Sequence, residues 1–173
     1  MLIKAQESCT MASMETEPTL DPTDRRILQV LQAQGRSTYD ELAAQVGLSA
    51  SAALRRVKRL EEQGVIAGYV ALVAPERVGL GLTAYINVRL EKHTESHKRN
   101  PMDLFAAAVQ TWPEVVECAA LSGEMDFLLR VVVRDMAHYS RFIMEQLLKH
   151  PSVQDCKTSF VLQRAKATTA LPV

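Results

Sequence analysis

The sequence has few cysteines, no net charge and no long apolar run, and each of these absences excludes a class of protein. Cys9, Cys118 and Cys156 are an odd number at wide spacing, so they form neither a CxxC pair nor a disulfide framework. No stretch approaches the roughly 18 apolar residues of a membrane span, and the opening MLIKAQESCTMASMETEP lacks the apolar run of a signal peptide. We therefore expect a protein of the reducing cytoplasm with no membrane partner.

The balance of charge also limits how the chain could meet nucleic acid. Twenty basic and 20 acidic residues cancel, which excludes a uniformly basic coat, so a polyanion would have to be met by a local patch. At 173 residues the chain is long enough for one domain or two small ones. Residues 1–19 have no helical or strand period, and we expect them to form a mobile tail.

Residues 20–68 carry the start and stop signals of three short helices. Each predicted helix is preceded by a capping residue: Asp21, Thr38 and Ser49. Each has a glycine at or beyond its end: Gly35, Gly47 and Gly64. Thr38 and Glu41 also have the spacing of a capping box. Three short helices with a tight turn between the last two are typical of a helix-turn-helix domain.

The third predicted helix concentrates four cations within five positions: Arg55, Arg56, Lys58 and Arg59. Each residue advances about 100° around a helix, so Ala53, Val57 and Leu60 share the side that packs on the other helices. The opposite side carries small and charged residues: Ser51, Ala52, Arg55, Lys58, Arg59 and Glu62. On this interpretation the cations do not serve the core and face solution.

A helix with such a face has the dimensions to enter a DNA major groove. Small residues at its start allow close approach to base edges, while arginine and lysine pair with guanine or with phosphate. The candidate DNA-binding residues are Ser49, Ser51, Ala52, Arg55, Arg56, Lys58 and Arg59. The alternative is an ordinary solvated face in which Glu61 and Glu62 pair locally with the cations, and such faces are far commoner than DNA readers.

The chain beyond Gly64 predicts a connection and then a second domain. The segment VIAGYVALVAP offers two short apolar strands around Ala67 and Gly68, which suits a wing or a connecting ribbon. Residues 69–81 are interpreted as the linker, and residues 82–173 as a domain with the element order βαββαβ. That order is the ferredoxin-like plan, so the fold class is α+β: an N-terminal, winged helix-turn-helix domain linked to a C-terminal ferredoxin-like domain.

Alternation along the strands of this second domain divides the sheet into two faces. The inward positions are predicted to be Ala84, Ile86, Val88 and Leu90, then Phe127, Leu129, Val131 and Val133, and a last strand alternates Cys156, Thr158, Phe160 and Leu162. The second helix of this domain, capped by Asp135, is predicted to carry on its inner face Met136, Tyr139, Ile143 and Leu147. Tyr85, Leu128 and Val132 would then lie on the opposite face, and exposed aliphatic residues there predict a homodimer. A dimer would supply two recognition helices.

From about Leu20 onward the chain resembles the Lrp/AsnC family of transcription regulators. The segments LDPTDRRILQVLQAQGR, ELAAQVGLS, RRVKRLEEQGVIAGY and SGEMDFLLRV carry the resemblance, in the family's order and spacing. It implies a regulator that binds double-stranded DNA and an amino-acid effector, needs no cofactor, is not an enzyme, and assembles as a dimer, tetramer or octamer. Many members begin the recognition helix with proline and threonine, whereas this chain has Ala50-Ser51-Ala52-Ala53, so the DNA sequence preference is not carried over.

The resemblance also implies where the effector binds. The family's G-x-x-D turn corresponds here to Gly123 and Asp126, so the effector candidates are Gly123, Glu124, Met125 and Asp126. Backbone N–H groups of this turn would receive the ligand carboxylate, and Asp126 or a neighbouring carboxylate would meet the ammonium group. Without the family match, a glycine that supplies positive φ and a solvated turn acid would be the simpler interpretation.

Two other classes of function stay open on the residues alone. His93 and His97 or the cysteines could serve a metal- or thiol-sensing repressor, although no third ligand lies near the histidines and buried neutral thiols are the usual state of such cysteines. Arg99 and Asn100 could form a phosphate loop in an acyl-phosphate hydrolase, but no nucleophile lies beside a base. We expect neither, and we predict that no metal is bound.

Overall fold

The computed structural model describes residues 19–91 and 100–173, which form two compact units. The first comprises the chain up to Ala71 together with Lys166–Val173, and the second comprises Leu72–Ala165. The division predicted from sequence differs from this at the end of the chain, because it assigned all of residues 82–173 to the second domain. The expected tail, apart from residue 19, and Cys9, His93, His97 and Arg99 lie outside the described residues.

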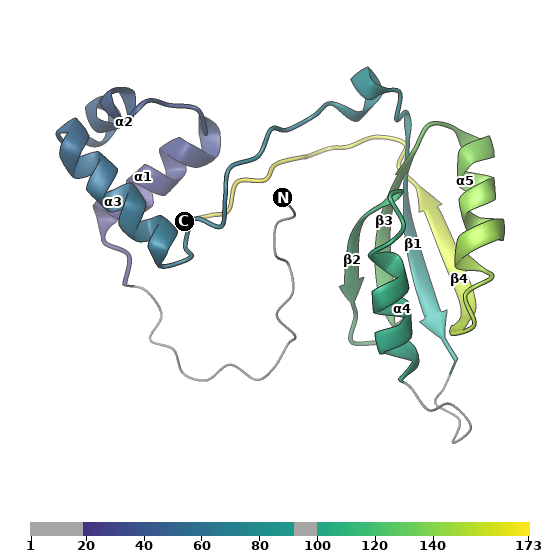
Figure 1. The fold of residues 1–173 in the computed structure, drawn as a ribbon. Helices are drawn as coiled ribbons and strands as arrows, with labels where there is room; N and C mark the ends of the chain where they lie inside the picture. Colours follow the sequence, from purple (N-terminus) through teal and green to yellow (C-terminus); the bar gives the residue numbers. More distant parts are fainter. Residues whose placement is uncertain (1–18, 92–99) are drawn as a thin grey trace. The chain divides into compact units, whose positions relative to one another are not determined.

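The first unit holds the three predicted helices, α1 (Pro22–Ala33), α2 (Tyr39–Val46) and α3 (Ala50–Glu62) (Figure 1). The predicted caps are confirmed: the side chains of Asp21, Thr38 and Ser49 accept hydrogen bonds from the backbone N–H of Asp24, Glu41 and Ala52. Gly47 ends α2 in the left-handed conformation, with φ of 72°, which other residues adopt only at a cost. The two-residue connection from Gly47 to Ala50 sets the direction of α3.

The core of this unit is formed by the sides of the helices that the helical periodicity predicts to be buried. Ile27, Leu42, Ala53, Val57 and Leu60 are almost fully buried where the three helices meet. Burial of these aliphatic side chains is the main favourable term that holds α3 in place. One side of α3 is therefore packed on the other two helices, and the opposite side, its free face, is exposed to solvent.

The prediction of two short strands around Ala67 and Gly68 is wrong for this structure. Residues 67–74 carry no strand, and Tyr69, Val70, Leu72 and Val73 are exposed along them. An isolated two-stranded ribbon is marginal in water, and here no neighbouring strand pairs with the segment within residues 19–91 and 100–173. A 3₁₀ turn, η1 (Pro75–Val78), follows and leads into the sheet.

The predicted βαββαβ order of the second unit is confirmed. Its strands are β1 (Leu82–Leu90), β2 (Val115–Ala120), β3 (Phe127–Val133) and β4 (Val153–Phe160), in the spatial order β2-β3-β1-β4 with antiparallel neighbours. The helices α4 (Pro101–Val109) and α5 (Met136–Phe142) lie on one face of this sheet (Figure 1). Asn100 caps α4 by accepting a hydrogen bond from the Met102 N–H.

The inward positions predicted for β1 and β3 are all buried. On the opposite face Tyr85 is 38% exposed, but Val132, which was expected to be exposed there, is only 6% exposed. The apolar surface available on that face is therefore smaller than predicted. The last strand was expected to extend to Leu162, but β4 ends at Phe160 and Leu162 is almost fully exposed.

The inner face of α5 is predicted only in part. Tyr139, Ile143 and Leu147 pack on the core, but Met136 is 54% exposed and Phe142, which was not predicted, is 1% exposed. The helix continues through a π-helical turn, η2 (Ile143–Leu147), whose i→i+5 hydrogen bonds enclose one more residue than those of an α-helix. Residues before and after this turn are therefore not related by a constant 100° per residue, and an inner face that joins Met136 to Leu147 at that angle is displaced from the face that packs on the core.

The end of the chain is bound to α1 within the first unit. The Gln32 side chain both donates to the Leu171 carbonyl (3.2 Å) and accepts from the Leu171 N–H (2.6 Å), and Gln29 donates to the Val173 carbonyl (2.7 Å). Val173 packs against the helical core. These contacts explain why residues 166–173 belong with the helices and not with the sheet.

Candidate nucleic-acid interface and effector turn

The free face of α3 forms a shallow, open hollow of about 490 Å³. It is lined by Ser51, Leu54, Arg55, Lys58, Arg59 and Glu62. The arrangement brings together most of the polar side chains that the helical angle assigned to this face. Leu54, which is partly buried, contributes an apolar part of the surface.

The start of α3 presents small residues to solvent. Ser49 caps the helix, its hydroxyl lies 3.2 Å from that of Ser51, and Ala52 is partly exposed beside them. Nothing larger than a hydroxyl projects from these three positions. A polymer with a regular groove could approach the backbone closely here.

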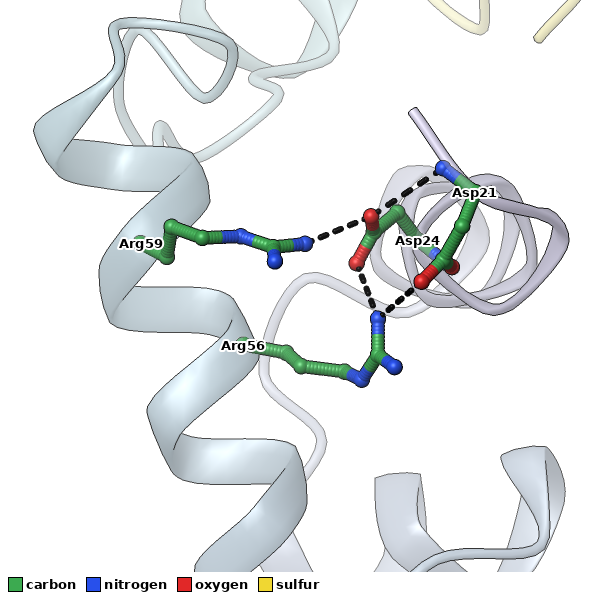
Figure 2. A network of polar contacts seen from close by, with 4 residues as sticks. All are labelled: Asp21, Asp24, Arg56 and Arg59. Carbon is green, nitrogen blue, oxygen red and sulfur yellow. Dashed lines mark hydrogen bonds and ion pairs between the residues drawn. The ribbon is translucent and has the colours of Figure 1, made fainter. Parts of the chain in front are cut away.

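The four cations of α3 fall into two pairs. Arg56 donates from Nη1 to Asp21 Oδ2 (2.6 Å) and to Asp24 Oδ1 (2.8 Å), and Arg59 donates from Nη2 to Asp24 Oδ2 (2.6 Å) (Figure 2). Within residues 19–91 and 100–173, Arg55 and Lys58 form no ion pair. The expectation that none of the cations serves the interior is therefore wrong for Arg56 and Arg59, whose partner Asp24 is 1% exposed.

The two pairs differ in the charge they present. Two carboxylates balance the two guanidinium groups of the network, whereas Arg55 and Lys58 are exposed and have no carboxylate partner among the described residues. The hydrogen bond from Arg56 is the largest of the effects that lower the pKa of the Asp21 carboxyl, and the same contact raises the pKa of Arg56. Arg55 and Lys58 are therefore the two cations of α3 that are free to pair with a polyanion.

The burial of Asp24 was not predicted from the sequence. A signal for burial existed, because Asp24 precedes Ile27 and Leu28 by three and four residues and so lies on the same side of the helix. Its arginine partners, more than 30 residues away, could not be identified from spacing. Only the packing of α3 on α1 brings the three side chains together.

The turn between β2 and β3 is tied to the end of β1 by Asp126. Its carboxylate accepts a hydrogen bond from the Leu90 N–H (2.7 Å), its own N–H donates to the Val88 carbonyl (2.9 Å), and its carbonyl accepts from the Leu121 N–H (2.8 Å). Asp126 is therefore not a solvated turn acid. Gly123 has φ of 153°, in the region that favours glycine.

The remaining effector candidates lie beside Arg89 of β1. The Arg89 guanidinium forms an ion pair with Glu124 and lies 3.9 Å from the Met125 sulfur. Its Nε atom is buried and has no hydrogen-bond partner among the residues that the structure describes. The turn thus combines a carboxylate, a guanidinium group and a thioether within a small volume, and Arg89 was not among the residues selected from sequence.

The two described cysteines lie on strands at opposite edges of the sheet. Cys118 is on β2 and Cys156 on β4, and both are free and partly buried. Burial raises the pKa of the Cys118 thiol to about 11, and burial together with the nearby Asp155 raises the pKa of Cys156. These thiols are therefore uncharged near neutral pH and weak nucleophiles.

Among residues 19–91 and 100–173, no three or more His, Cys, Asp or Glu side chains are grouped so as to hold a metal ion. The histidines His93 and His97 fall outside these ranges. None of the described helices is long and apolar enough to cross a bilayer.

Two family models together match nearly the whole described chain. Residues 20–67 match a winged helix-turn-helix DNA-binding model, and residues 83–171 match the Lrp/AsnC ligand binding domain. The chain is 36% identical to the DNA-binding transcriptional activator DecR of Escherichia coli strain K12, over 89% of this chain and 99% of that protein. It is 40% identical to the leucine-responsive regulatory protein of Haemophilus influenzae, over 88% and 89% of the two chains.

Solved structures agree with these sequence matches. A transcriptional regulator of Neisseria meningitidis in complex with L-Met superimposes with a TM-score of 0.84 at 49% identity, covering 89% of this chain and 97% of that one. An AsnC family transcriptional regulator of Agrobacterium tumefaciens gives a TM-score of 0.80 at 37% identity, over 88% and 97% of the two chains.

Proposed function

Since the chain belongs to the Lrp/AsnC family of DNA-binding transcriptional regulators, and is not an enzyme, we propose that the free face of α3 contacts the DNA and that the β2–β3 turn contributes to an amino-acid effector site. The observation that carries the first half is the position of Arg55 and Lys58. Both are exposed on α3, line one hollow and have no carboxylate partner among the described residues.

Each residue of this face has a proposed role. Arg55 and Lys58 contact phosphate or guanine, and Ser49 and Ser51 donate to the DNA backbone from the start of the helix. Ala52 lets the helix approach the base edges. Arg59 reaches phosphate from the rim of the hollow. Arg56 was predicted to contact DNA as well, but its two ion pairs favour a role in holding α3 on α1.

The salt dependence of DNA binding tests this assignment. Arg55→Ala and Lys58→Ala should each weaken binding to a duplex of roughly 30 base pairs, long enough for two half-sites one turn apart. Each should also reduce the slope of log affinity against log salt by about 0.9, because one phosphate contact is lost. Lys149→Ala, which removes an exposed cation of the second unit, is the matched control and should leave the slope unchanged. An unchanged slope for both α3 variants would contradict the assignment.

The effector half of the proposal is supported by the fixed geometry of the turn. Asp126 is held by three hydrogen bonds, Gly123 adopts a conformation that keeps the backbone accessible, and Arg89 offers a buried donor nearby. Backbone N–H groups or Arg89 would receive the carboxylate of an amino acid, and the free oxygen of Asp126 or the Glu124 carboxylate would meet its ammonium group. The relative from N. meningitidis binds L-Met, so a methionine-like ligand is a natural first choice.

A thermal-shift screen against the common amino acids tests this half. A ligand present at 100 times its Kd raises the free energy of unfolding by about 2.7 kcal/mol, which a melting curve detects readily. Asp126→Asn, which keeps an oxygen to accept from the Leu90 N–H, should reduce the shift without unfolding the turn. A full shift in that variant would exclude the Asp126 charge from ligand recognition.

We also propose that the chain acts as a cytoplasmic homo-oligomer. The sheet face opposite the helices carries Tyr85 and the half-buried Leu128, apolar groups on a surface that none of the helices described for the unit covers. A second copy packing on this face would supply a second α3 for a neighbouring turn of DNA. Light scattering after size exclusion measures the assembly, and a monomer at micromolar concentration would contradict the proposal.

A further inference from the structure

The carboxylate of Asp24 is the centre of the contact between α1 and α3. It accepts hydrogen bonds from the Asp21 N–H (3.2 Å), from Arg56 Nη1 (2.8 Å) and from Arg59 Nη2 (2.6 Å) (Figure 2). The residue is 1% exposed. A buried carboxylate is tolerated only when it is paired and hydrogen-bonded, and here all its partners come from the cap of α1 and from α3.

The two arginine partners occupy different environments. The Arg56 side chain is 27% exposed and is held between Asp21 and Asp24. The Arg59 side chain is 46% exposed and lines the hollow together with Arg55 and Lys58. Among the described residues, Arg59 donates only from Nη2, so the other nitrogen atoms of its guanidinium group are available at the surface.

A guanidinium group has five N–H donors in a rigid plane, so a carboxylate on one edge leaves other donors with a fixed direction. An unrestrained surface arginine must lose rotamer freedom when it contacts phosphate, and immobilising one long side chain costs about three- to tenfold in affinity. Arg59 has lost part of that freedom already, because its partner Asp24 is buried and held by hydrogen bonds from Asp21 and Arg56. The ion pair with Asp24 therefore orients Arg59 for a contact with phosphate, although Asp24 itself does not touch the phosphate.

We infer that Asp24 is a positioning residue for DNA binding: its buried carboxylate fixes the Arg59 guanidinium group at the rim of the DNA-facing hollow, while Arg56 closes the contact between α1 and α3. This inference rests on the proposed role of α3. It divides the four cations by function. Arg55 and Lys58 supply free charge, Arg59 supplies an oriented contact, and Arg56 holds the helix in place.

A double-mutant cycle on Asp24 and Arg59 tests the inference with the full chain and a labelled duplex of roughly 30 base pairs. Arg59→Ala should weaken binding and lower the salt slope by about 0.9. Asp24→Asn should weaken binding about three- to tenfold with the salt slope unchanged, since no phosphate contact is removed. In the Arg59→Ala background, Asp24→Asn should cause no further loss. Any general effect of the carboxylate charge on DNA appears in both backgrounds and cancels in the cycle.

Arg56→Ala is the structural control. It removes the bonds to Asp21 and Asp24 but leaves the Asp24–Arg59 pair, so it should lower the melting temperature while folded protein keeps the wild-type salt slope. Arg59→Lys covers the case in which Asp24→Asn fails to fold. Lysine keeps the charge but has no planar guanidinium group that could bind Asp24 on one edge and a phosphate on another. The variant should therefore bind DNA about three- to tenfold more weakly, with the wild-type salt slope.

Several results would overturn the inference. Equal losses on Asp24→Asn in both backgrounds would mean that Asp24 acts on the placement of α3 as a whole. Wild-type affinity for Arg59→Lys, or for Asp24→Asn, would mean that orientation of Arg59 contributes nothing. If Arg55→Ala and Lys58→Ala lower the salt slope but Arg59→Ala does not, the proposed DNA face stands and the inference alone fails.

Discussion

Replacing Asp126 by alanine removes the carboxylate that joins the β2–β3 turn to the end of β1. The lost hydrogen bond is the one that the Leu90 N–H donates to the carboxylate at 2.7 Å. Leu90 is only 5% exposed, so water can replace the carboxylate as an acceptor only poorly. Hydrogen bonds to charged groups contribute about 1.5–3 kcal/mol. Asp126 is partly exposed, so we take the lower end, about 1.5 kcal/mol. In a unit the size of Leu72–Ala165 this lowers the melting temperature by about 6–12 °C.

Melting curves followed by circular dichroism measure this effect, and Asp126→Asn is the matched control. Asparagine keeps an oxygen that accepts from Leu90, so its loss should be roughly half that of alanine. Below the melting range, Asp126→Ala should abolish the effector response while DNA affinity stays nearly intact. A melting temperature within about 2 °C of the wild type would refute the anchoring role, because it corresponds to less than about 0.5 kcal/mol. Loss of DNA affinity together with the effector response would refute the division between the two sites.

Three further results are expected. Gly47→Ala should destabilise the helical unit by about 1–2 kcal/mol, because φ is 72° there and an added Cβ meets no atom that could compensate; a wild-type melting curve would contradict this. Cys118 in the native protein should react with iodoacetamide at pH 8 far more slowly than after denaturation, since burial raises its pKa to about 11, and equal rates would show that the thiol is accessible and ionised. The pKa of Asp135 lies below its ordinary value of 3.8, chiefly because its carboxylate accepts from the His138 N–H, so its stabilising contribution is complete above that pH and is lost as the pH falls through the lower folded value. Asp135→Asn should therefore reduce the loss in free energy of unfolding as the pH falls below 3.8, and an equal loss in the variant and the wild type would count against this contribution.

Local signals in the sequence determined the elements of the fold. Caps at Asp21, Thr38 and Ser49 and the glycine at Gly47 are decided by residues within one turn, so the helix boundaries could be predicted. The alternation of β1 and β3 gave the buried face directly, because side chains on a strand point to opposite sides. The outward position of Arg55 and Lys58 followed from the helical angle alone.

The same local patterns were misleading where the backbone departs from regular geometry or where a strand needs a partner. The inner face predicted for α5 spans the π-helical turn at Ile143–Leu147, where the angle per residue changes, and it included the exposed Met136 but not the buried Phe142. Residues 67–74 have the composition of a strand but remain unpaired in the described chain. A hydrophobic pattern states which residues would be buried in a regular element, but it does not state whether that element forms.

Only the tertiary structure decided which distant groups meet. Asp24 reaches Arg59 across 35 positions, Asp126 reaches Leu90 across 36, and Gln29 reaches Val173 across 144. The sequence by itself determined that four cations crowd one helix, that a G-x-x-D turn joins two strands, and that both lie in a chain with the helix-turn-helix and βαββαβ order. It could not show that two of those cations pair with Asp21 and the buried Asp24, because the partner of a charge depends on how helices pack and not on the spacing of residues along the chain.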